Sequence, residues 1–188
     1  SLGELDLRGI VTSSSVRPFN PHIPEYDFHS DLPPAPNRLN FVANRTHGVR
    51  LAREAGLSDI PDPIMGIKGN LQRPDSGKIE DTAPVDSPGT RLVLETALSA
   101  SPEKPLVLIM GGQASIAADA YLLDPGIADR MVVAWLVGDQ DGLTGYNASA
   151  DPWAAYIVLE RLRLVAFPTD YADPRVSKER LHTLPESA

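Results

Sequence analysis

The sequence contains no cysteine among its 188 residues, which excludes a disulfide scaffold, a thiolate metal site and a catalytic thiol. The absence of cysteine leaves the cellular compartment open, with the cytoplasm as the favoured expectation. Basic residues are few: Lys and Arg number 17 against 25 Asp and Glu, a formal charge of −8. This balance argues against a nucleic acid or an anionic membrane as partner. No apolar run approaches the roughly 18 residues that cross a membrane.

What is present is typical of one globular domain spanning residues 1–188. Hydrophobic residues make up 42% and charged residues 22% of the chain, which is ordinary for a folded protein. Proline is frequent, with 18 residues, and six of them fall between Pro18 and Pro36. Proline disrupts helices and central strands. We therefore interpret residues 13–38 as a Pro-rich insertion loop, either a surface excursion or a cover over a pocket.

Apolar runs and helical patterns alternate along the chain. The two runs over residues 105–110 and 131–137 are typical of strands buried on both faces. Strands alternating with helices predict an α/β fold, an open and mostly parallel sheet flanked by helices. The expected strands cover residues 5–12, 64–67, 105–110, 131–137 and 164–167. The expected helices cover residues 40–56, 88–100, 113–123 and 152–161. Ser87 and Asp151 are the expected N-caps of the second and fourth of these helices, each followed by a proline at the first helical position. Residues 138–149 are expected to form a loop.

Polar residues follow the predicted strands at the end where open α/β sheets bind ligands. Gly111-Gly112 follows one strand and offers either an anion cradle or a tight turn. Asp139 and Asp141 follow the next strand. A carboxylate pair can hold a divalent cation or a sugar hydroxyl, and the alternative is a solvated acidic turn.

Several segments resemble one family. Residues 108–117, followed by Leu123-Asp124-Pro125, resemble the "LGPLTNIA…LDP" motif of the inosine–uridine nucleoside hydrolases. Residues 145–155 resemble their "EFNIYVDPEAA" motif. Residues 5–12 and 51–61 are similar to the family's "IELLGITT" strand and "LLELAGRTDIP" helix end. The resemblance covers most of the chain outside the Pro-rich insertion.

The resemblance implies an enzyme that hydrolyses the N-glycosidic bond of ribonucleosides. A Ca²⁺ ion would hold the ribose hydroxyls and assist attack of water on the anomeric carbon, roles that suit a hard cation with oxygen ligands. It implies a metal ligand at the main-chain carbonyl of Ala114. The expected partner is a ribonucleoside or a ribose-like small molecule, and a homo-oligomer is left open. The expected substrate-binding residues are Gln113, Asp139, Asp141, Tyr146 and Asn147.

The chain also departs from the family. The family's Asp-rich segment would precede Ser1, and its late His-Asp pair would follow residue 167. Ala114 and Gly145 replace a threonine and a glutamate, so no catalytic residue is assigned. Two hypotheses follow: a hydrolase whose missing aspartates lie outside this segment, or a non-catalytic nucleoside-binding or interaction domain on the same fold. A third is a protein that binds a nucleotide phosphate at Gly111-Gly112.

Overall fold

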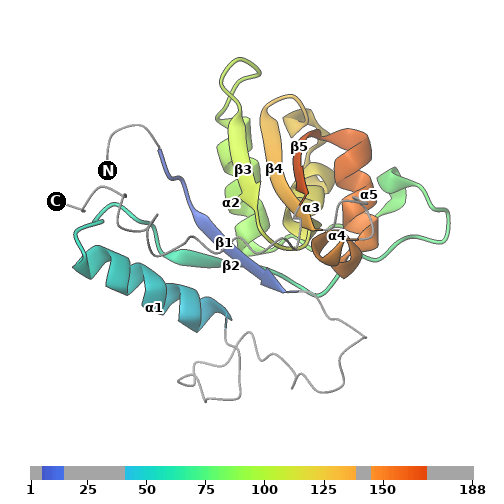
Figure 1. The fold of residues 1–188 in the computed structure, drawn as a ribbon. Coiled ribbons are helices and arrows are strands. Elements are labelled where there is room, and N and C mark those ends of the chain that lie inside the picture. Colours follow the sequence, from blue (N-terminus) through green and yellow to red (C-terminus); the bar gives the residue numbers. More distant parts are fainter. Residues whose placement is uncertain (1–5, 15–40, 139–144, 169–188) are drawn as a thin grey trace, which may run out of the picture.

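The computed structural model describes residues 6–14, 41–138 and 145–168 (Figure 1). Within these ranges, no helix is long and apolar enough to cross a membrane. The strands are β1 (Ile10–Ser14), β2 (Pro63–Lys68), β3 (Leu106–Met110), β4 (Met131–Gly138) and β5 (Arg163–Pro168). The helices are α1 (Phe41–Glu54), α2 (Pro88–Leu98), α3 (Ser115–Leu123), α4 (Tyr146–Ala150) and α5 (Pro152–Arg161), with short 3-10 turns at Ile79–Asp81 and Pro125–Ile127.

All strand pairs in the described residues are parallel, and they form two sheets. The first contains β1 and β2, and the second has the order β3-β4-β5. This arrangement confirms an α/β fold with open parallel sheets packed against helices. The sequence predicted one sheet, whereas the described strands divide into two.

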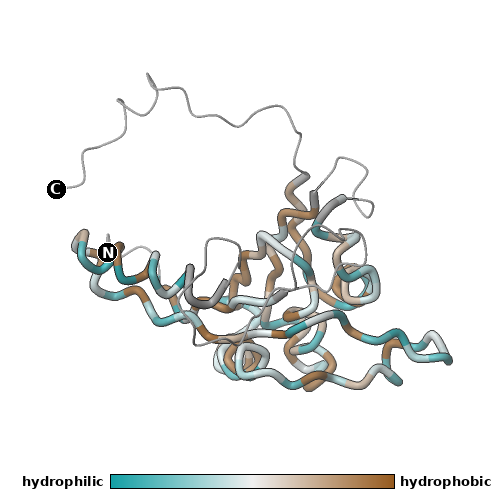
Figure 2. The backbone as a smooth tube through the Cα atoms, turned by 90° about the horizontal axis from the view of Figure 1, so that it is seen from below, coloured by the Kyte–Doolittle hydropathy of each residue, from teal (hydrophilic) through white to brown (hydrophobic). Residues whose placement is uncertain are grey.

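The two sheets share a helical layer. Helix α2 contacts both β2 and β3, and α3 packs against α2, α5 and β2. Helix α2 lies close to the first sheet: a Cβ atom added at Gly89 would be 3.0 Å from the Cα atom of Gly66 in β2. The outer end of the 69–87 loop is hydrophilic (Figure 2).

Helix ends follow the local sequence. The Ser87 hydroxyl accepts a hydrogen bond from the Thr90 N–H at 3.1 Å, and Pro88 occupies the first position of α2. After α1, Gly56 has a φ of 96°, and the N–H of Leu57 donates to the Ala52 carbonyl. This is a glycine-dependent Schellman ending. The predicted ends of both helices are therefore confirmed to within two residues.

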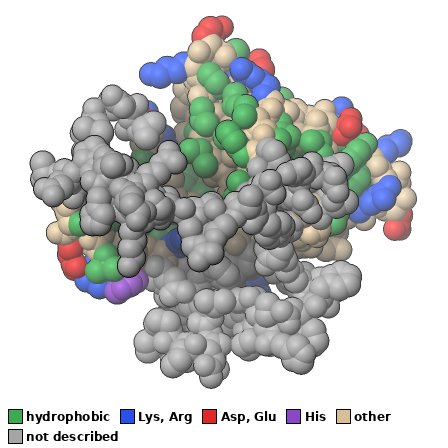
Figure 3. Space-filling model, in the orientation of Figure 1, with side chains coloured by type: hydrophobic (Ala, Val, Ile, Leu, Met, Phe, Trp, Pro, Cys, Tyr) green, Lys and Arg blue, Asp and Glu red, His purple; other side chains and the backbone are tan. Residues whose placement is uncertain are grey.

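The second sheet is buried on one face only. In β4, Met131, Val133 and Trp135 are fully buried against the helices. In β3, Val107 and Ile109 are 56% and 82% exposed on the other face, and hydrophobic side chains gather over this part of the molecule in Figure 3. The expectation that residues 105–110 and 131–137 are buried on both faces is wrong for the described residues. The reason is that the crossovers β3-α3-β4 and β4-α5-β5 turn in the same direction and place both helices on the same face.

Two other predictions need correction. The first strand begins at Ile10 rather than at residue 5. The segment 138–149, expected to be a loop, contains the start of α4, where the Ser149 N–H donates to the Gly145 carbonyl at 2.8 Å. The Pro-rich stretch of 13–38 lies outside the described residues from residue 15 onward.

The close packing of α2 on the first sheet predicts opposite effects at two helical glycines. A Cβ atom at Gly89 would lie 2.4 Å from the Val11 Cγ1 atom, whereas one at Gly48 in α1 meets no atom within 4 Å. Alanine favours a helix over glycine by about 1 kcal/mol, but overpacking costs about 1–3 kcal/mol. We expect Gly89→Ala to lower the free energy of unfolding and Gly48→Ala to raise it, measured by urea denaturation. Shifts of equal sign would contradict the packing described.

Candidate functional site

Asn147 joins the carboxyl ends of two strands. Its Nδ2 atom donates to the Leu136 carbonyl at 2.7 Å and to the Gly111 carbonyl at 3.3 Å. Leu136 belongs to β4, and Gly111 directly follows β3. Helix α4, which carries Asn147, lies at this end of the sheet (Figure 1). The predicted ribose-binding amide is therefore at the edge where α/β sheets bind ligands.

Gln113 connects the same edge to the first sheet. Its buried side chain donates from Nε2 to the Gly69 carbonyl, just after β2, at 3.2 Å. The neighbouring Gly112 carbonyl accepts from the Trp135 Nε1 atom at 2.7 Å. The structure thus brings Gln113 and Asn147 to one edge. The carbonyl oxygens of both amides accept no hydrogen bond from the described residues.

The expected calcium ligand is already engaged. Ala114 is fully buried, and its carbonyl accepts the N–H groups of Ala117 and Ala118 at 3.1 and 3.2 Å, in the first turn of α3. Calcium takes six to eight oxygen ligands, and no group of three or more acidic or histidine side chains that could hold a metal occurs in the part of the chain that the structure describes. The described residues therefore do not fit a calcium site. Asp139, Asp141 and the side chain of Tyr146 lie outside them.

Asp151 forms a junction that the sequence shows only in part. Its Oδ1 atom accepts the Ala154 N–H at 3.1 Å, which confirms its predicted role as the N-cap of α5. Its Oδ2 atom also accepts the Leu71 N–H at 2.9 Å and the Ser115 hydroxyl at 2.5 Å. These partners are 80 and 36 residues away along the chain, so no local pattern signals them. One fully buried carboxylate thereby ties together the loop after β2 and the starts of α3 and α5.

An open cavity of about 590 Å³ lies beside this junction, between the 69–87 loop and α5. The Arg73 guanidinium lies over the Trp153 ring, 5.2 Å from its centroid. Trp153 stacks against Tyr156 with 5.3 Å between centroids and donates from Nε1 to the Thr82 hydroxyl at 3.0 Å. Sequence reasoning did not identify this cavity, because its walls come from separate segments. They are Asn70, Leu71, Arg73, Gly77, Asp151, Pro152, Trp153 and Tyr156.

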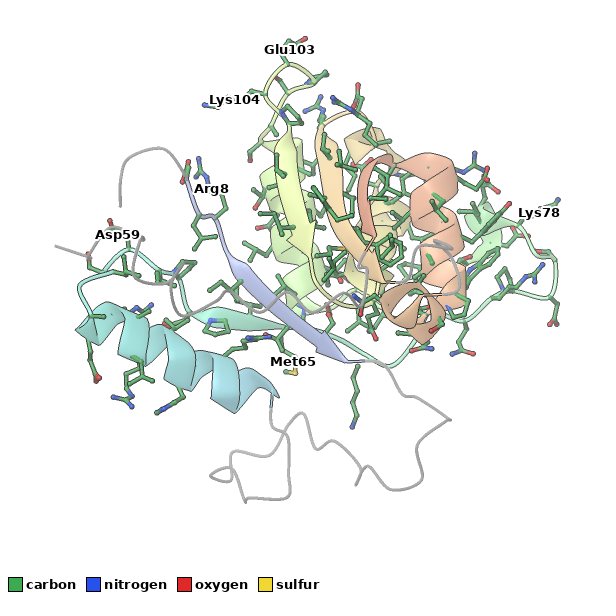
Figure 4. The ribbon with its side chains drawn as sticks, in the orientation of Figure 1. Arg8, Asp59, Met65, Lys78, Glu103 and Lys104 are labelled. Atoms are coloured by element: carbon green, nitrogen blue, oxygen red, sulfur yellow. The ribbon has the colours of Figure 1, made fainter. Side chains whose placement is uncertain are left out.

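The opposite ends of the strands carry a different feature. The pKa of Glu103, which is fully exposed, is lowered by a hydrogen bond from the Ser101 side chain and by one from the backbone of Glu103 itself. Glu103 and Lys104 project from the turn before β3, at the end of the sheet far from α4 (Figure 4). This carboxylate is therefore not part of the edge formed by Gln113 and Asn147.

Comparison of the chain with protein-family models, with curated proteins and with solved structures gives no match. Membership of the nucleoside hydrolase family therefore stays a hypothesis that depends on the motif resemblance.

The junction predicts that Asp151 tolerates no neutral replacement. Asparagine has the same shape, but its NH₂ group would face one of the N–H donors of Leu71 and Ala154. A buried donor left without an acceptor costs about 1–3 kcal/mol, and more when a charged partner is lost. We expect Asp151→Asn and Asp151→Ala to lower the free energy of unfolding by about 2–4 kcal/mol in urea denaturation.

Asp129, which is exposed, provides the control for this prediction. Asp129→Asn should change the free energy of unfolding by less than about 0.5 kcal/mol. An Asp151→Asn protein as stable as the unmodified one would show that the charge of this carboxylate is not needed.

Proposed function

We propose that this chain is a ribonucleoside-binding domain with a nucleoside hydrolase-like fold. The observation that carries the proposal is the pair of amides, Gln113 and Asn147, held at the carboxyl edge of the parallel strands. Each side chain donates from its amide nitrogen to main-chain carbonyls, which fixes its orientation. Their oxygens accept no hydrogen bond from the described residues and can therefore accept from the hydroxyl groups of a ligand.

The chemistry of this edge suits a neutral sugar. Ribose presents hydroxyl donors and no charge, and each neutral hydrogen bond contributes about 0.5–1.5 kcal/mol net. Pre-oriented amides lose little side-chain freedom when the ligand binds. The motif resemblance supports the same assignment, because Asn147 matches the asparagine of the family's second motif.

Hydrolysis of the N-glycosidic bond is the second candidate, and the same motifs favour it. In that reaction water adds to the anomeric carbon and the bond between this carbon and the nucleobase breaks. A general base, such as a carboxylate of the protein, accepts the proton of the water. The Asp151 carboxylate is fully engaged by hydrogen bonds, so it is not that base. The resemblance places the family's aspartates outside the described residues, and Asp139 and Asp141 also lie outside them.

Calorimetric titration with inosine, uridine and ribose tests the proposal. We expect saturable binding of all three to the unmodified protein, because the ribose provides the shared contacts. Gln113→Ala and Asn147→Ala should each weaken inosine binding by about tenfold, equivalent to about 1.4 kcal/mol. Gln72→Ala is the matched control and should bind inosine unchanged, since this exposed amide donates to the Asn70 carbonyl and to no other group of the described residues.

The measurement also separates the two candidates. Incubation with inosine and CaCl₂, followed by chromatography of the free base, detects hydrolysis. Binding without release of hypoxanthine supports a binding domain, and release of the base supports the hydrolase. If neither inosine, uridine nor ribose binds, the proposed function is wrong. Circular dichroism of each variant confirms that the fold is retained.

A further inference from the structure

The cavity beside α5 has features of an anion site, and it is independent of the edge proposed to bind ribose. Arg73 lines it and forms no ion pair or hydrogen bond with any of the described residues. The other charged residue in the wall is Asp151, which is 1% exposed and whose oxygens accept three hydrogen bonds. The charge that a ligand meets in this wall is therefore positive.

The position of Arg73 is fixed before any ligand arrives. Its guanidinium lies over Trp153, 5.2 Å from the ring centroid, a cation–π contact that stabilises this position of the side chain. Gly77 has a φ of 65°, and a Cβ atom there would lie 3.1 Å from the Nη2 atom of Arg73. Because this contact is made by the face of the ring and no described residue pairs with the guanidinium, its N–H donors are available for two parallel hydrogen bonds to an oxyanion.

The remaining walls suit a planar ring. Tyr156 is 45% exposed and continues the aromatic surface of Trp153. Asn70, which also lines the cavity, is held in place by a hydrogen bond from Nδ2 to the Ala150 carbonyl at 2.8 Å.

We propose that this cavity binds a nucleotide-like ligand, a planar heteroaromatic ring bearing a phosphate group. The phosphate contacts Arg73, and the ring lies along Tyr156. The volume of about 590 Å³ falls within the roughly 300–1,000 Å³ of small-molecule sites. The ligand differs from that of the ribose edge because recognition depends on its negative charge.

The test is titration of the protein with AMP, with adenosine as the uncharged counterpart. Binding is followed by calorimetry and by ¹⁹F NMR of protein labelled with 5-fluorotryptophan. The chain has two tryptophans, and Trp135 is fully buried in β4. We expect AMP to shift the Trp153 resonance saturably. A shift of the Trp135 resonance reports the other site, because Trp135 donates to the Gly112 carbonyl beside Gln113. Adenosine should shift the Trp153 resonance at least about tenfold more weakly, the effect of losing one charge-assisted contact of about 1.4 kcal/mol.

Variants of the 69–87 loop provide the controls. Arg73→Gln should weaken AMP binding by about tenfold or more, and Arg73→Lys by less, because lysine keeps the charge and loses the paired donors. Lys78 lies at the outer end of the same loop, away from α5 (Figure 4), and it does not line the cavity. Lys78→Gln should therefore bind AMP as the unmodified protein does.

Three results would overturn the proposal: no saturable Trp153 shift at millimolar AMP, equal shifts with AMP and adenosine, or unchanged AMP binding in Arg73→Gln. A failure of the proposed ribose binding at Gln113 and Asn147 can be distinguished from a failure of this proposal. Gln113→Ala should leave the AMP-induced Trp153 shift unchanged. Loss of inosine binding together with a retained Trp153 response therefore contradicts only the proposed function.

Discussion

The arrangement of this molecule depends on the buried carboxylate of Asp151. An ionised carboxylate without partners in the interior costs several kcal/mol, so the chain has to bring donors to it. It takes them from three places: Leu71 after β2, Ser115 at the start of α3, and Ala154 at the start of α5. These contacts connect the loop of the first sheet to the helices that cover the second.

Both candidate sites extend from this junction in opposite directions along the chain. Asn147 lies four residues before Asp151 and reaches the ends of β3 and β4. Trp153 lies two residues after it and forms the aromatic wall of the cavity under Arg73. The amide edge presents uncharged acceptors, whereas the cavity presents the Arg73 guanidinium, which has no ion pair within the part of the chain that the structure describes. One structural carboxylate thus positions two surfaces with different chemical preferences.

The sequence predicted the features that depend on near neighbours. The caps at Ser87-Pro88 and Asp151-Pro152 were readable because a capping oxygen and its N–H partner lie three residues apart. Exposure of Ile109 was not readable, because an apolar run has the same letters whether one face or both are covered. The contact of Gln113 with Gly69 spans 44 residues, and the amide itself gives no sign of its partner. The placement of Gln113 and Asn147 at one edge followed from topology, and the cavity under Arg73 did not.

The matched motif residues each have a structural task in this chain that accounts for them without catalysis. The Asp124 side chain accepts the Gly126 N–H at 2.8 Å and begins a 3-10 turn. Asp151 caps α5, and Asn147 joins two strand ends. Catalysis with calcium requires several oxygen ligands that converge on one ion, whereas ribose binding requires only well-placed neutral groups. A chain can therefore resemble the hydrolase motifs and keep the binding edge while the chemistry of hydrolysis depends on carboxylates elsewhere. For this reason we propose binding, rather than hydrolysis, as the function of this chain.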